Sequence, residues 1–335
     1  MIKRILLVAM LAVIASSASA QKSVVDSLDN RVDKIEKMID ALPTITGYTH
    51  LAYRYSEVTS EFQIRRARVT LTDPIYKDLL GYRFQVEFAK TPRILDMAID
   101  IKPYKQLNFS VGQNMIAFSL DNVYKAPSEV DFIDFPLVIQ RLAGFSDLSG
   151  VGYSARDLGV QMYGSLLNDK VWYKVSVGNG CEAGQSEDNK SKDANGTVLV
   201  KPFDGLVLTG SYYYGETAEA YSARERWGAG ISYSAERFFV NAEYIEGLTG
   251  SLYSHGAYAS TAYWVSDKFA PMLRYDYFCN DAANAPEINE INYTVGLMYA
   301  PLKNLSVQVD YILKNYNGVD TPRVNQYTIM LVGKF

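Results

Sequence analysis

An alternation of apolar and polar residues recurs along almost the whole chain after Pro43, and no other feature limits the fold as strongly. In the last segment, Arg323 to Phe335, the residues Tyr327, Ile329 and Leu331 fall on one face of an extended strand. Because strand side chains alternate between two faces, each such segment predicts a strand with one apolar face. About sixteen segments follow this pattern, without a convincing long helix between them. The expected strands lie near residues 44–55, 61–72, 81–90, 94–102, 105–113, 156–166, 169–178, 196–202, 205–214, 225–234, 237–246, 253–265, 268–279, 289–300, 303–314 and 323–335.

The connectors between these segments sort by length onto two sides of the expected sheet. Short connectors gather on the inner side, at residues 73–80, 103–104, 167–168, 203–204, 235–236, 266–267 and 301–302. Nearly all the long ones fall on the outer side, at residues 114–155, 179–195, 215–224, 280–288 and 315–322. This sorting, with an even strand number, is typical of a transmembrane antiparallel β-barrel, whereas a soluble sandwich has no reason to sort its loops. In such a barrel the terminal strand must pair with the strand near 44–55, because closure leaves no edge.

The first 20 residues have the pattern of a secretory signal peptide. Lys3 and Arg4 form a positive region, an apolar stretch runs from Ile5 to Ile14, and Ala18-Ser19-Ala20 is a small-residue cleavage site. The apolar stretch is much shorter than the ~20 residues that span a bilayer, which disfavours a membrane anchor. We therefore expect residues 1–20 to be removed and the rest of the chain to be exported.

Residues 21–43 differ from everything after them because they carry a heptad pattern. Apolar residues recur at spacings of three and four, at Val25, Leu28, Val32, Ile35, Ile39 and Leu42. Such a narrow seam favours self-association as a coiled coil. A surface helix docked on its own domain is the alternative. We expect a short periplasmic coiled-coil segment at 21–43 and the β-barrel at 44–335.

The charge balance and the aromatic content narrow the function. Lys and Arg number 33 and Asp and Glu 37, giving a formal net charge of −4, which argues against a general nucleic-acid binder. The chain has 26 tyrosines, an excess that suits membrane–water interface belts, where one end of the ring meets water.

Candidate sites for chemistry are few. His50 and His255 lack acidic or cysteine partners at metal spacing, so we expect neither a metal nor another cofactor. We find no convincing nucleophile elbow, phosphate loop or calcium loop, and so predict that the protein is not an enzyme. Cys181 and Cys279 both fall in expected outer loops. A disulfide between them could pin the mouth of the barrel, and two buried free thiols are the ordinary alternative.

Several stretches of the expected barrel resemble a known family. They are Phe62 to Arg68, Val111 to Gln113, Arg156 to Val160 and Arg274 to Asp276, together with the terminal Phe335. In order and approximate spacing they are similar to the phosphate-selective porin O and P family of Gram-negative outer membranes. The resemblance implies a trimeric outer-membrane channel of about 16 strands, with a long third outer loop folded into the lumen as its constriction. Residues 114–155 occupy that loop's position here.

A channel selects solutes by the charges that line its narrowest part. The candidate pore-lining residues are Arg54, Arg66, Arg68, Arg83, Arg141, Lys174 and Arg274. Guanidinium groups at two-residue spacing, as at Arg66 and Arg68, could pass an anion from one bidentate site to the next. Carboxylates assigned to the same faces or to the long loop oppose an anion preference: Glu87, Asp96, Asp100, Asp157, Glu243, Asp276, Glu129, Asp131, Asp134 and Asp147.

The sequence therefore predicts an outer-membrane porin that passively conducts small polar or anionic solutes, with a preference for anions such as phosphate left open. We expect it to be embedded in outer-membrane lipid as a homotrimer. One rival is a structural or adhesive barrel with a plugged lumen, whose coiled coil tethers the envelope. A barrel-embedded hydrolase is a further rival, and it would need a nucleophile–base pair.

Overall fold

The computed structural model describes residues 31–32, 34, 42–127, 129–149, 154–181, 183–185, 189–216 and 222–335. The chain divides into two compact units, Met1–Ile45 and Thr46–Phe335. The expected signal peptide at 1–20 lies outside the described residues, as does most of the expected coiled coil at 21–43, of which Arg31, Val32 and Lys34 are helical. None of the helices in the described ranges is long and apolar enough to cross a membrane.

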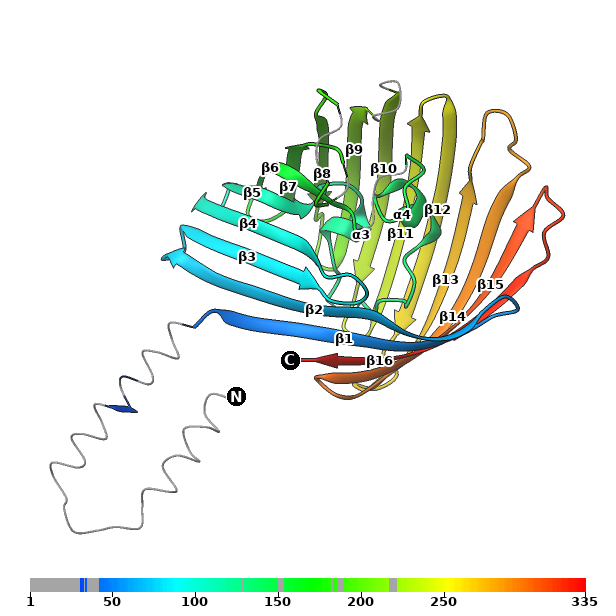
Figure 1. The fold of residues 1–335 in the computed structure, drawn as a ribbon, viewed down its shortest axis with the longest axis horizontal. Coiled ribbons are helices and arrows are strands. Elements are labelled where there is room, and N and C mark those ends of the chain that lie inside the picture. The colour runs from blue at the N-terminus through cyan, green and yellow to red at the C-terminus, as the bar shows by residue number, and fades with distance from the viewer. Residues whose placement is uncertain are drawn as a thin grey trace, which may run out of the picture. The chain divides into compact units, whose positions relative to one another are not determined.

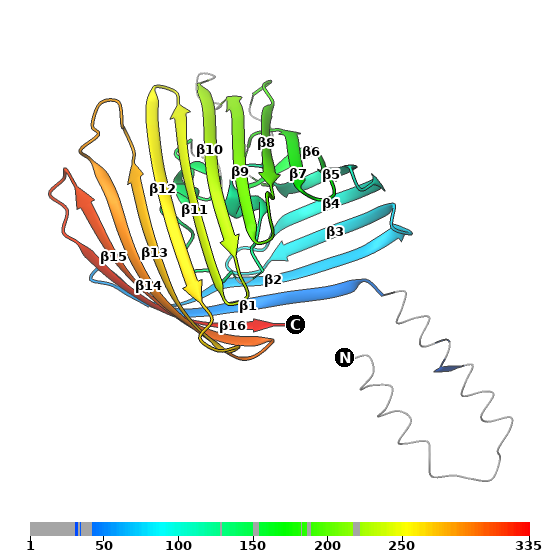
Figure 2. The ribbon, with the colours of Figure 1, turned by 180° about the vertical axis from the view of Figure 1, so that it is seen from behind.

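The described part of the chain folds into sixteen strands that close as an antiparallel barrel (Figure 1; Figure 2). Each strand pairs with its neighbours in the sequence, and β1 pairs with β16. The strands are β1 (Thr44–Tyr55), β2 (Ser60–Tyr76), β3 (Leu80–Glu87), β4 (Arg93–Tyr104), β5 (Leu107–Met115), β6 (Arg156–Leu166), β7 (Val171–Gly178), β8 (Asp193–Val200), β9 (Leu206–Glu216), β10 (Ala223–Ser234), β11 (Phe238–Thr249), β12 (Leu252–Tyr263), β13 (Phe269–Cys279), β14 (Asn289–Leu302), β15 (Leu305–Asn317) and β16 (Val324–Lys334). The predicted antiparallel β-barrel and its strand number are confirmed.

The closing pair is the one that barrel closure predicts. β1 and β16 run antiparallel with a register from Tyr48 opposite Lys334 to Tyr55 opposite Tyr327. Beyond the last strand residue, the Phe335 N–H donates to the Gly47 carbonyl at 2.9 Å, and the Gly47 N–H donates back at 3.0 Å. The sheet therefore has no unpaired edge at the chain ends.

The two faces of the barrel invert the arrangement of a water-soluble protein. Tyr327, Ile329 and Leu331 point outward and are 49%, 48% and 42% exposed, whereas the inward Thr328 and the inward Asp310 of β15 are buried. This is the apolar-out, polar-in alternation of a barrel whose outside meets lipid.

One strand boundary differs clearly from the expectation. β2 continues to Tyr76, beyond the predicted end near residue 72, and passes through Pro74. The pairing of β2 with β3 shifts register between Pro74 and Tyr76. Such an irregularity lets a strand accommodate proline, which cannot donate to the ladder.

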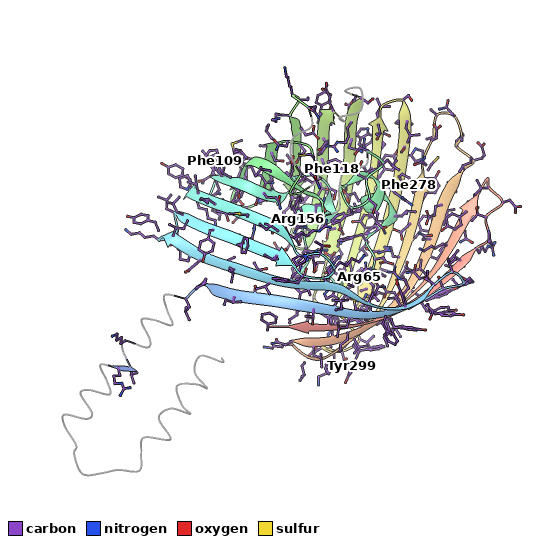
Figure 3. The ribbon with its side chains drawn as sticks, in the orientation of Figure 1. Arg65, Phe109, Phe118, Arg156, Phe278 and Tyr299 are labelled. Carbon is purple, nitrogen blue, oxygen red and sulfur yellow. The ribbon has the colours of Figure 1, made fainter. Side chains whose placement is uncertain are left out.

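The described part of the long connector between β5 and β6, residues 116–127, 129–149 and 154–155, lies inside the barrel (Figure 3). It contains the short helices α3 (Leu120–Val123) and α4 (Leu137–Leu142). α3 packs against β9 and β10, and α4 packs against β11, β12 and β13. Apolar residues of this loop form one core with inward side chains of the wall: Ile116, Phe118, Leu137, Val138, Ile139, Leu142, Ala143 and Ala155 with Tyr213, Ile245, Tyr258 and Phe278.

Candidate functional site

The backbone of the inner loop is held by polar side chains of the barrel wall. Buried backbone N–H groups need acceptors, and a loop inside a barrel finds them on the surrounding strands. The Leu120 N–H donates to Glu243 at 2.7 Å, the Ile133 N–H to Asp310 at 2.8 Å and the Leu137 N–H to Asp276 at 2.9 Å. The sequence predicts Glu243 and Asp276 as lumen carboxylates that repel anions. In the structure their carboxylates accept hydrogen bonds from backbone N–H groups of the inner loop.

Asp134 joins the loop to the strands at the barrel seam. Its carboxylate accepts hydrogen bonds from Arg54 at 2.9 and 3.1 Å and from Gln326 at 3.0 Å, and it lies 2.6 Å from Arg65 Nη2. Arg274 donates to the Asp134 carbonyl at 2.7 Å. Burial alone would raise the pKa of Asp134, but Arg65 and Arg54 outweigh it and hold this pKa well below its usual range. The carboxylate therefore remains charged and clasps the loop against β1, β2 and β16.

Arg65 is a site residue that strict alternation assigns to the opposite face from Arg66. In the structure both reach the loop, because Arg65 pairs with Asp134 and the Arg66 guanidinium lies over the Phe135 ring at 5.1 Å. The strand is irregular here, since the Ala67 N–H donates to the Glu87 side chain at 2.7 Å. The sequence carries a signal of this change of phase. Its apolar residues fall at 62 and 64 and then at 67, 69 and 71, a step of three within a period of two.

Most of the predicted arginines are neutralised by a partner. Arg68 Nε donates to Glu87 at 2.8 Å, and Arg274 Nε donates to Asp276 at 2.8 Å. Arg83 lies 3.5 Å from Asp96, a carboxylate that also accepts from Arg156 at 3.0 Å. These pairs cancel much of the attraction that each arginine alone would exert on a passing anion.

Arg66 differs from these arginines because it makes no ion pair or hydrogen bond with any residue that the structure describes. It lines each of three cavities among the described residues, which meet at its side chain. We call them the outer cavity of 230 Å³, the central cavity of 520 Å³ and the inner cavity of 640 Å³. The outer cavity reaches Lys90 and Ser154, and the inner cavity reaches Lys303 and Phe335 at the opposite end of the barrel. Together they trace a route along the inner face of β1 and β2.

Two further predicted cations, Arg141 and Lys174, line none of the three cavities. Arg141 is in the last turn of α4, half-buried. Lys174 lies on β7, and its Nζ donates to the Met115 carbonyl at 3.5 Å. Neither has an ion-pair partner within the described residues.

The disulfide considered between Cys181 and Cys279 is not formed. Cys181 follows β7 and Cys279 ends β13, so the barrel order separates them by several strands. The Cys181 thiol donates to the Gln185 carbonyl at 3.6 Å, and the Cys279 thiol donates to the Ile288 carbonyl at 3.5 Å. Both cysteines are buried thiols. No group of three metal-ligating side chains occurs within the described ranges.

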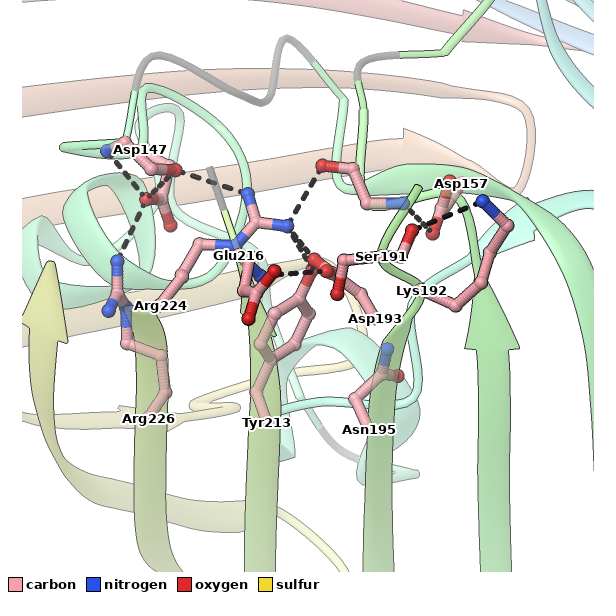
Figure 4. Close-up of polar contacts among 12 residues, drawn as sticks. Asp147, Asp157, Ser191, Lys192, Asp193, Asn195, Tyr213, Glu216, Arg224 and Arg226 are labelled. Atoms are coloured by element: carbon pink, nitrogen blue, oxygen red, sulfur yellow. Dashed lines mark hydrogen bonds and ion pairs between the residues drawn. The ribbon is translucent and has the colours of Figure 1, made fainter. Parts of the chain in front are cut away.

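The end of the inner loop is anchored to the outer part of β8, β9 and β10 (Figure 4). Arg224 pairs with Asp193 and Tyr213 and donates to Ser149 at 3.1 Å. Arg226, which is 1% exposed, pairs with Asp147 at 3.0 Å. The described part of the loop is therefore attached to the barrel at several points, of which the clasp at Asp134 is one.

Known proteins match both the sequence and the fold. The family model described as phosphate-selective porin O and P matches residues 48–217. The anion-selective porin from Comamonas acidovorans is 10% identical with a TM-score of 0.68, over 88% of this chain and 99% of that one. In-vitro folded OmpT of Vibrio cholerae, in its trimer form, is 14% identical with a TM-score of 0.66, over 88% of this chain and 100% of that one. The outer membrane channel DcaP of Acinetobacter baumannii is 13% identical with a TM-score of 0.62, over 88% of this chain and 97% of that one. No curated protein sequence matches the chain.

Proposed function

Because the chain belongs to the phosphate-selective porin O and P family and is thus an outer-membrane porin, we propose that its pore prefers anions among the small polar solutes that it conducts. The observation that carries this preference is Arg66, which has no carboxylate partner in the described structure and lines the outer, central and inner cavities. An anion 4 Å from an unpaired charge gains roughly 4 kcal/mol at an effective dielectric constant near 20. A passing anion gains much less near Arg68, because Glu87 already occupies that guanidinium.

The state of the wall carboxylates supports the same preference. Glu87 and Asp276 bind arginines, and Glu243 accepts a backbone N–H of the loop. Each carboxylate is therefore engaged by a donor and presents less free negative charge to a solute. Lys90 adds a cation to the outer cavity, which an incoming solute reaches first.

We also propose that the chain forms a homotrimer in outer-membrane lipid, with residues 1–20 removed and residues 21–43 as a coiled coil on the periplasmic side. The family and the trimer form of OmpT support the assembly. The family is one of channels, so we infer no catalytic role.

A plugged barrel with a structural role is the second candidate, and the attachments of the inner loop favour it. Asp134 clasps the seam, while Leu120 and Leu137 bind the opposite wall. Stable stepwise currents from purified protein in planar bilayers would support the porin, and a silent barrel would support the plug.

The anion preference is tested by the reversal potential in asymmetric potassium chloride. Wild-type protein should favour chloride over potassium, and Arg66→Gln should move the reversal potential toward zero. Arg237→Gln is the matched control, because Arg237 is an exposed arginine that pairs with Asp267 and lines none of the three cavities. An Arg66→Gln channel with wild-type selectivity would contradict the proposal.

A further inference from the structure

The central cavity carries opposite charges on two of its walls. On the loop side, Lys125 Nζ lies 2.6 Å from Asp131, 3.4 Å from Glu129 and 3.9 Å from Asp121. One ammonium group thus faces three carboxylates, which leaves this wall negative. On the barrel side stands Arg66, whose guanidinium has no acidic partner in the described structure. A simple anion would use only the arginine wall.

Two buried polar groups of the cavity also lack partners. Asn241 and Tyr258 are 4% and 3% exposed, and both line the cavity. Neither the Asn241 Oδ1 nor the Tyr258 hydroxyl has a hydrogen-bond partner among the described residues. Both atoms lie behind the cavity surface and are inaccessible to solvent, so Asn241 and Tyr258 form part of the cavity wall without offering these atoms to a solute.

The size and the remaining walls of the cavity suit a small organic molecule. Its 520 Å³ falls within the roughly 300–1,000 Å³ of ligand sites. Tyr48, Phe132 and Phe135 add aromatic surface to its lining. The cavity therefore combines an apolar surface with two oppositely charged walls.

We propose that the central cavity binds zwitterionic solutes of the α-amino acid class, with the ammonium group toward Asp131 and Glu129 and the carboxylate toward Arg66. A zwitterion is attracted by both walls at once, whereas an anion is attracted only by Arg66 and a cation only by the carboxylates. The inference rests on the proposed function, because a solute reaches this cavity through the pore.

The test compares three probes of similar size and shape in single-channel recordings from the purified full-length protein at low salt. L-phenylalanine carries both charges, phenylacetate only the negative one and phenethylamine only the positive one. L-phenylalanine should interrupt the current at a concentration about tenfold lower than either relative, equivalent to roughly 1.4 kcal/mol. Equal block by phenylacetate and L-phenylalanine would overturn the inference and leave a simple anion site.

A variant of the loop wall tests the orientation of the bound solute. Asp131→Asn is a mild change because the Asp131 side chain is 72% exposed. It should weaken block by L-phenylalanine about threefold and leave block by phenylacetate unchanged. Asp267→Asn, at an exposed pair outside the cavity, is the control and should change neither. Block by L-phenylalanine that is unchanged in Asp131→Asn would contradict the proposed orientation of the solute and the inference.

A silent barrel separates the two proposals. Such a result contradicts the proposed conduction, and calorimetry of the detergent-solubilised protein then decides the inference. Preferential binding of L-phenylalanine over phenylacetate that weakens in Asp131→Asn would support the site without transport. Absence of that preference would overturn the site as well.

Discussion

Asp134→Asn should release the inner loop from the barrel seam. The Asp134 carboxylate lies 2.9 Å from Arg54 and 2.6 Å from Arg65, and the three side chains are only 18%, 22% and 17% exposed, respectively. Asparagine keeps one acceptor oxygen but removes the charge, which leaves two guanidinium groups unpaired inside the barrel. Removing one partner of a buried ion pair costs about 3–5 kcal/mol. Because water reaches these groups, we expect ~3 kcal/mol, or roughly a 150-fold shift between the clasped and released loop.

Single-channel recording measures this shift. The Asp134→Asn channel should show a larger and noisier conductance, because the released loop no longer crosses to the seam. Its anion selectivity should rise, because the Arg54 and Arg65 charges become available to solutes. Asp267→Asn, which breaks an exposed pair with Arg237, should behave as wild type. Conductance, noise and selectivity in Asp134→Asn that equal those of wild type would refute the clasp.

Further predictions concern the other attachments of the loop and the effect of pH. Asp276→Ala leaves Arg274 and the Leu137 N–H without their buried acceptor, at a cost of about 3–5 kcal/mol. The inner loop should then become accessible to protease in a barrel that is otherwise intact. Limited proteolysis with mass spectrometry measures this accessibility. A loop that stays fully resistant to protease would contradict the prediction. The depressed pKa of Asp134 means that its contribution is complete above the ordinary carboxylate value of about 4 and is lost only as the pH falls through the lower folded value. The difference in conductance between wild type and Asp134→Asn should therefore stay constant from pH 8 to about pH 4, and a difference that disappears near pH 5 would contradict this assignment.

The barrel could be predicted from the sequence because its determinants are local. Alternation with a period of two survives in each strand, and the sorting of loop lengths fixes the direction of the chain. The pairing of β1 with β16 follows from closure, although its residues lie at opposite ends of the chain. The sequence does not predict the extension of β2 through Pro74, because proline normally ends an interior strand.

The site was harder to predict because its contacts are distant in sequence. Asp134 and Gln326 are 192 positions apart, and Ile133 and Asp310 are 177 apart. The sequence predicts carboxylates such as Asp276 as free lumen charges, because nothing in it indicates that they bind arginines and loop N–H groups. The change of phase in the apolar residues of β2 is a sequence signal for Arg65. Arg66 is a candidate from the sequence, but nothing in the sequence indicates that this arginine lines all three cavities.

The most direct test of the account places a chosen charge at position 66. Arg66→Cys is prepared in a background in which Cys181→Ser and Cys279→Ser remove the buried native thiols. In an open channel, a trimethylammonium-bearing thiol reagent should restore the anion preference, and a sulfonate-bearing reagent should reverse it toward cations. Both should change the current of a single channel in discrete steps. A single-channel current and a reversal potential that are unchanged by both reagents would contradict the claim that solutes pass Arg66.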